Sequence, residues 1–146
     1  MSEINFYHGG VEQDFDESQI DILRKSFKQQ NSHNSYVGFY MFDEENFDMA
    51  VRYANQENAL KQTNTKGVLK VVMSEDVNIC WLTPFTITRV TEEQIINAKV
   101  QGYDLIAGTM LNSVEYVLVN KDKIIKTEFI PLDKVEDYKI SGKLSL

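Results

Sequence analysis

The sequence predicts an α+β fold with mainly antiparallel strands, in a single domain that spans residues 1–146. Three observations lead to this prediction. The chain of 146 residues has a one-domain length, with room for a sizeable core. Its predicted strands outnumber its predicted helices. The strands also cluster late in the chain, without the regular strand–helix alternation that builds a parallel sheet.

The first third of the chain predicts a strand, a helix and a second strand. Apolar and polar residues alternate over residues 4–8, which predicts a strand that ends at Gly9-Gly10. Apolar residues at helical spacing predict a helix over residues 16–30. After a polar loop, an aromatic stretch predicts the second strand over residues 38–42.

A second helix is expected from Asp43, a good N-cap residue, to about Leu60. The side chains at i, i+3, i+4 and i+7 give it an apolar inner face, made of Phe47, Ala50, Val51 and Ala54.

The second half of the chain predicts five strands and one helix. Thr91 and Gln94 form a capping-box pattern, which predicts a helix that ends near Gln101, with Gly102 as the residue that follows its C-terminus. The final fifteen residues are polar and are expected to pack lightly. The predicted strands cover residues 67–73, 77–82, 103–107, 114–119 and 124–130.

Charge and composition narrow the classes of function. A formal charge of −7 makes phosphate backbones a less favourable partner. No apolar run is long enough to span a membrane, so no membrane partner is expected. The N-terminus shows no secretory signal, which predicts a cytoplasmic protein or one exported by a signal-less route. Cys80 is the only cysteine, and its apolar neighbours predict an inert core thiol.

Common nucleotide-binding, hydrolase and metalloprotease motifs are absent from the sequence. A metal site would need His8 and His33 together with carboxylates, and nothing in their spacing fixes such a site. The sequence therefore predicts no metal.

Three stretches stand out when they are considered together. The first is Tyr7-His8-Gly9, and the second is the strand over residues 38–42 with the helix that carries residues 50–54. The third is the stretch over residues 112–120, which contains Glu115 in a largely apolar strand. Their order and spacing resemble the ADP-ribosyltransferase superfamily, in the branch of diphtheria toxin and the poly(ADP-ribose) polymerases. That branch carries histidine, tyrosine and glutamate on three separate strands. The resemblance implies split antiparallel β-sheets with flanking helices and a cleft for NAD.

The resemblance also implies roles for five residues. His8 would bind a ribose hydroxyl of NAD, and Gly9 would offer its backbone to the nicotinamide amide. Tyr40 and Tyr53 would enclose the nicotinamide ring. Glu115 would bind the ribose 2′-hydroxyl and stabilise positive charge at the anomeric carbon, so Glu115, His8 and Tyr40 are the expected catalytic residues.

Structural interpretations of the same residues stay open. His8 could be a core histidine beside a turn, and Tyr53 could be a core residue of an amphipathic helix. Glu115 could be a partly exposed strand residue, although an unpaired carboxylate in so apolar a strand is costly.

Two departures from the superfamily limit the resemblance. Ala50 stands where the polymerases have a helix serine that holds the nicotinamide amide, so one hydrogen bond at this cofactor-binding position is missing or supplied elsewhere. The other branch of the superfamily has an arginine on the first strand and a Glu-x-Glu loop. Here His8 and Ser113 stand at the corresponding positions, which argues against the arginine-directed reaction of that branch.

The resemblance therefore implies a mono-ADP-ribosyltransferase that moves ADP-ribose from NAD to a macromolecular acceptor. The negative charge favours a protein acceptor over nucleic acid. The short chain is similar to compact toxins and effectors, for which an antitoxin or immunity protein is an expected partner. A non-catalytic module that binds NAD, ADP-ribose or a partner, and an NAD glycohydrolase, are the alternatives.

Overall fold

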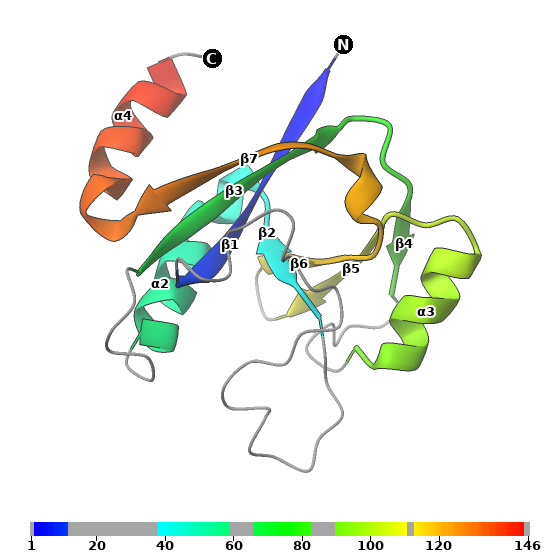
Figure 1. The fold of residues 1–146 in the computed structure, drawn as a ribbon. Helices are drawn as coiled ribbons and strands as arrows, with labels where there is room; N and C mark the ends of the chain where they lie inside the picture. Colours follow the sequence, from blue (N-terminus) through cyan, green and yellow to red (C-terminus); the bar gives the residue numbers. More distant parts are fainter. Residues whose placement is uncertain (1, 12–37, 59–65, 83–89, 111–112, 145–146) are drawn as a thin grey trace.

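The computed structural model describes residues 2–11, 38–58, 66–82, 90–110 and 113–144, which form one seven-stranded sheet and three helices (Figure 1). The strands are β1 (Glu3–Val11), β2 (Tyr40–Phe42), β3 (Lys66–Ser74), β4 (Ile79–Trp81), β5 (Leu105–Met110), β6 (Ser113–Leu118) and β7 (Ile124–Pro131). The helices are α2 (Phe47–Asn58), α3 (Glu92–Val100) and α4 (Val135–Leu144), with 3-10 turns η3 (Glu44–Asn46), η5 (Lys121–Lys123) and η6 (Leu132–Lys134).

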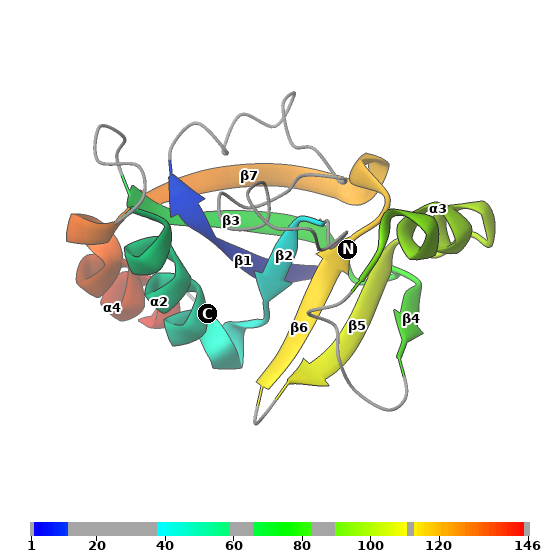
Figure 2. The ribbon, with the colours of Figure 1, turned by 90° about the horizontal axis from the view of Figure 1, so that it is seen from below.

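The strand order is β4-β5-β6-β2-β1-β3-β7. Every neighbouring pair is antiparallel except β4 and β5, which are parallel. The α+β prediction with mainly antiparallel strands is therefore confirmed. Two halves of the sheet meet between β1 and β2, which pair only at Tyr7 and Phe42. Figure 2 shows these halves diverging, with α2 and α4 beside β1 and β3 and with α3 beside β4 and β5.

The largest group of buried side chains lies on the face of the sheet that these helices do not cover. We call it the inner cluster, and it joins residues of β3, such as Leu69, to residues of β5, such as Leu105. These strands are far apart in the sheet order, so the sheet must curve around the cluster. The inner cluster also contains Phe6, Phe39, Met41, Val71, Met73, Ala107, Tyr116 and Leu118.

Two of the predicted helix starts, at Asp43 and Thr91, are confirmed. Asp43 caps η3, which leads directly into α2, and its carboxylate accepts a hydrogen bond from the Asn46 backbone at 3.1 Å. Thr91 and Gln94 form the reciprocal capping box of α3. Gly102 follows α3 with a φ of 88°, a conformation in which glycine has no steric cost.

The predicted end of the first strand is wrong. β1 does not end at Gly9-Gly10, because both glycines keep pairing with β3 up to Val11. The final residues form α4, a helix that the sequence did not predict. Its described side chains are mostly exposed, and it packs on the sheet through buried Val135 and through a 2.6 Å hydrogen bond between the Tyr138 and Tyr7 hydroxyls. The predicted helix over residues 16–30 and the residue His33 lie outside the described residues.

The backbone of α2 touches β1 at Gly9. A Cβ atom at this position would collide with the Ala50 carbonyl oxygen and would lie 2.7 Å from the Ala54 backbone nitrogen. Ala50 and Ala54 are themselves fully buried. Three small residues thus bring the helix closer to the strand than larger side chains would allow, which explains a glycine inside a regular strand.

Within the described ranges, no helix combines the length and the apolar character needed to cross a membrane.

We expect Gly9→Ala to lower the free energy of unfolding by about 3 kcal/mol, because the added methyl group pushes α2 away from the sheet. Urea unfolding followed by circular dichroism measures the loss. Gly102→Asn is the matched control, since nothing lies within 4 Å of its Cβ position and asparagine tolerates this backbone conformation. Equal losses in the two variants would show that the close contact of α2 with β1 is not what Gly9 provides.

Candidate functional site

The candidate site is built around the carboxyl group of Glu115 on β6. Glu115 pairs with Phe42 of β2, and Phe42 pairs with Tyr7 of β1. Paired residues of neighbouring strands project from the same face, so these three side chains form a row across the sheet on the side covered by α2. The Glu115 side chain is 2% exposed, and its Oε2 atom has no hydrogen-bond partner among the described residues.

Tyr53 of α2 is the polar side chain that faces this carboxyl. Its ring stacks on Phe42, the cross-strand partner of Glu115, with the centroids 5.5 Å apart, and this stacking brings the Tyr53 hydroxyl beside the carboxyl group. Burial raises the pKa of Glu115 from the ordinary 4.5 to about 7, and the hydrogen bond from Tyr53 opposes this rise. Burial, followed by the charge of Glu115, raises the pKa of Tyr53. Near neutral pH, Glu115 therefore exists in both its protonated and its ionised form.

A second buried carboxylate, Asp104, differs from Glu115 in how many of its oxygens are hydrogen-bonded. Asp104 is 4% exposed, but both of its oxygens accept hydrogen bonds, from the Asn78 backbone at 2.8 Å and from the Asn120 side chain at 3.1 Å. Asp104 thus links two segments of the chain by hydrogen bonds, and its carboxylate is satisfied without a ligand. Glu115 has a buried oxygen that nothing in the described chain satisfies. An unsatisfied polar atom of this kind is costly, which points to a functional group.

His8 joins the two halves of the sheet. Its Nδ1 donates to the Tyr40 carbonyl oxygen at 2.7 Å, just beyond the single pair of residues that connects β1 and β2. Its ring stacks on Phe39 with the centroids 3.9 Å apart, and the side chain is 7% exposed. His8 is therefore a core residue with a structural hydrogen bond. This bond places a proton on Nδ1 and fixes the orientation of the ring.

Tyr40 is partly buried and packs against the cluster under α3, which includes Ile95 and Val117. Its neighbours Phe39 and Met41 belong to the inner cluster, as their alternation along the strand predicted. Because Tyr40 lies two residues from Phe42 on the same strand, it projects from the same face as Glu115.

The described contacts join the six predicted site residues in pairs, but they do not bring His8 to Glu115. His8 follows Tyr7 in β1, so its side chain projects from the opposite face of the sheet, where it stacks on Phe39. Tyr53 meets Glu115 through its hydroxyl, His8 meets the Tyr40 backbone, and Gly9 meets the Ala50 backbone. The Gly9 contact is the least expected of the three, because α2 covers the side of Gly9 on which a Cβ would lie. The sequence also missed Phe42, which lies directly between Tyr7 and Glu115, because strand register cannot be deduced from a three-residue strand.

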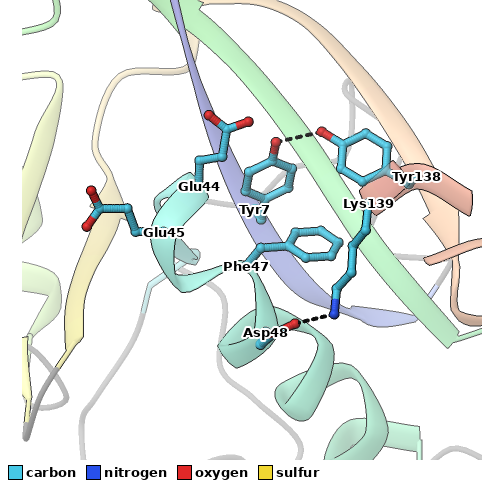
Figure 3. Close-up of a pocket in the computed structure, with 7 residues that line it drawn as sticks. All are labelled: Tyr7, Glu44, Glu45, Phe47, Asp48, Tyr138 and Lys139. Atoms are coloured by element: carbon cyan, nitrogen blue, oxygen red, sulfur yellow. Dashed lines mark hydrogen bonds and ion pairs between the residues drawn. The ribbon is translucent and has the colours of Figure 1, made fainter. Parts of the chain in front are cut away.

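A pocket of about 140 Å³ lies elsewhere on the α2 side of the sheet, between the start of α2 and α4 (Figure 3). None of the six predicted residues lines it. Its lining residues are Tyr7, Glu44, Glu45, Phe47, Asp48, Tyr138 and Lys139. Figure 3 shows two contacts among its polar groups, the hydrogen bond between the Tyr7 and Tyr138 hydroxyls and the 2.7 Å ion pair between Lys139 and Asp48.

In the part of the chain that the structure describes, no three side chains of histidine, cysteine, aspartate or glutamate gather in a way that could hold a metal ion.

We expect Glu115→Gln to stabilise the protein increasingly as the pH rises. The pKa of about 7 in the folded state lies above that of the unfolded chain, so the folded protein binds this proton more tightly. Its stability is therefore highest at low pH and falls as the pH rises through 7. The variant lacks this loss, and its advantage in free energy of unfolding should grow from about 1 kcal/mol at pH 5.5 to about 3 kcal/mol at pH 8.5.

Urea titrations at the two pH values measure this difference. Glu128→Gln on β7 is the control, since Glu128 is exposed and its substitution should leave the pH dependence unchanged. If Glu115→Gln followed the same pH profile as wild type, the carboxyl group would not be held in an unfavourable environment.

Comparison of the sequence with models of known protein families finds no match, and comparison with curated proteins finds none either. The functional interpretation therefore depends on the chemistry of the site and on the resemblance of its three motifs.

Proposed function

We propose that this protein is a mono-ADP-ribosyltransferase that transfers ADP-ribose from NAD to a macromolecular acceptor. The observation that carries the proposal is the buried carboxyl group of Glu115, with one oxygen that has no partner among the described residues. The order of the strands supports it, because the glutamate strand β6, the tyrosine strand β2 and the histidine strand β1 are neighbours in one sheet. The strands that carry the three motifs are thus neighbours, with Tyr40 and Glu115 on one face of the sheet and His8 on the other.

The reaction breaks the bond between nicotinamide and the anomeric carbon of ribose, and positive charge develops on that carbon. In its ionised form, Glu115 would accept a hydrogen bond from the ribose 2′-hydroxyl through Oε2 and would stabilise the developing charge. This stabilisation is strong because the carboxylate is buried in a medium of low polarity. A nucleophilic group of the acceptor then bonds to the anomeric carbon as nicotinamide leaves.

The remaining roles follow the resemblance. His8 would bind a ribose hydroxyl, and this role would require its ring to leave Phe39 on the face of the sheet opposite Glu115. Tyr40 and Tyr53 would contact the nicotinamide ring. Ala50 provides no side-chain hydrogen bond to the nicotinamide amide, and that part of the site would depend on the backbone of Gly9. Because α2 packs on Gly9, this step would require the helix to shift.

The acceptor is proposed to be a protein, since the net charge of −7 disfavours a nucleic-acid backbone. A small transferase of this type would suit the role of a toxin or effector, with an antitoxin or immunity protein as its partner.

We expect wild-type protein to consume labelled NAD in a cell lysate and to label an acceptor, and Glu115→Gln to reduce the rate at least about 100-fold. The rate should rise with pH through about 7, as Glu115 ionises. Mass spectrometry of the lysate, searched for added ADP-ribose, identifies the product. Glu128→Gln serves as the control with unchanged activity. Equal rates for wild type and Glu115→Gln, or no NAD consumption by either, would contradict the proposal.

A second candidate is a module on the same fold that binds NAD or ADP-ribose without turnover. The contact between Gly9 and Ala50 favours ADP-ribose as the ligand of such a module, because α2 packs directly on the glycine that would bind nicotinamide and ADP-ribose has no nicotinamide. Calorimetry that shows saturable NAD binding with no nicotinamide released would support this candidate. Release of free ADP-ribose would instead identify an NAD glycohydrolase, in which water replaces the acceptor.

A further inference from the structure

We propose that Tyr53 is a positioning residue whose hydroxyl holds one oxygen of the Glu115 carboxyl group and leaves the other, Oε2, for a hydroxyl group of the substrate. The identity of that substrate, the ribose of NAD, rests on the proposed function, but the contact between the two side chains does not. This role differs from stacking on nicotinamide, for which the aromatic ring of Tyr53 would be sufficient.

The ring of Tyr53 is held by the residue next to Glu115. It stacks on Phe42 at a centroid distance of 5.5 Å and an interplanar angle of 24°. Phe42 is the direct cross-strand partner of Glu115, and the Cβ atoms of such partners lie about 5 Å apart. A ring that rests on Phe42 therefore places its hydroxyl group beside the carboxyl group.

The packing of α2 on β1 sets the distance between the helix and the sheet, and with it the position of Tyr53 relative to Glu115. Ala50 lies one turn before Tyr53, and its carbonyl oxygen packs against Gly9 of β1. Because this contact involves backbone atoms, α2 cannot approach the sheet more closely. The distance from Tyr53 to β6 is therefore set by the fold and not by the tyrosine side chain alone.

Few other groups among the described residues can change the pKa of the Glu115 carboxyl group. On β2 its neighbour is the apolar Phe42, and on β5 it is Gly108, which has no side chain. On α2, Arg52 acts on Tyr53, whereas the described group that hydrogen-bonds to Glu115 is the Tyr53 hydroxyl. A donor to the carboxylate favours its ionised form, so Tyr53 opposes the effect of burial. Without this hydroxyl, Glu115 would stay protonated, and unable to stabilise positive charge, up to a higher pH.

Tyr53→Phe tests the proposal because it keeps the ring and removes only the hydroxyl. The titration of the Glu115 carboxyl carbon is followed by carbon-13 NMR in protein without NAD, with the signal assigned by its loss in Glu115→Gln. We expect the midpoint to move to higher pH in Tyr53→Phe. Tyr138→Phe is the matched control, since it removes a hydroxyl that a different helix contributes to a bond with Tyr7, and it should leave the midpoint unchanged. An unchanged midpoint in Tyr53→Phe overturns the proposal.

Kinetics add a second measurement. We expect kcat/KM of Tyr53→Phe for NAD to fall about 10-fold at pH 6 and to stay within about 2-fold of wild type at pH 9, where both proteins are ionised. A tyrosine that acts only by stacking predicts the same activity for phenylalanine at every pH, and that result overturns the positioning role. If the protein does not consume NAD at all, the proposed function fails, while the NMR titration still decides whether Tyr53 holds Glu115.

Discussion

The structure depends on one close contact, the packing of the α2 backbone against β1 at Gly9. The absence of a side chain at this position lets the helix lie directly on the sheet, with Ala50 and Ala54 buried between them. Two distant features follow. Tyr53 reaches across β2 to Glu115, and the start of α2 meets α4 to form the pocket lined by Tyr7 and Tyr138.

Burial of Glu115 is the chemical result of this packing. A carboxyl group under a helix loses its water, and one hydrogen bond from Tyr53 replaces that water only in part. The protein thus carries a local cost in stability that a glutamine would avoid. Costs of this kind are typical of functional groups, whose environment is set by chemistry and not by stability. Asp104 is the contrasting case, because both of its oxygens accept hydrogen bonds and its role is structural.

The sequence predicted the features that local patterns encode. The capping box at Thr91, the N-cap at Asp43 and the apolar strand around Glu115 were all found as expected, since each depends on residues only a few positions apart. The site could be predicted only in part. Cross-strand register decides that Phe42 separates Glu115 from Tyr7, and this register is a long-range property.

The remaining misses have the same origin. The pair Gly9-Gly10 suggests the end of a strand, but pairing with β3 continues through both residues, because Gly9 allows the close approach of α2 and is not part of a turn. The last helix carries few apolar residues, and its docking depends on Val135 and Tyr138 meeting a surface that forms only in the folded protein.

The half-ionised state of Glu115 couples occupancy of the site to proton exchange with the solvent. Near neutral pH, Glu115 carries a proton in a fraction of the protein molecules. A ligand that binds only the carboxylate form must therefore release this proton when it binds. Its apparent affinity would then weaken in mildly acidic surroundings, and the heat of association would vary with the ionisation enthalpy of the buffer. Occupancy of the site by such a ligand would therefore change over the pH range in which Glu115 ionises.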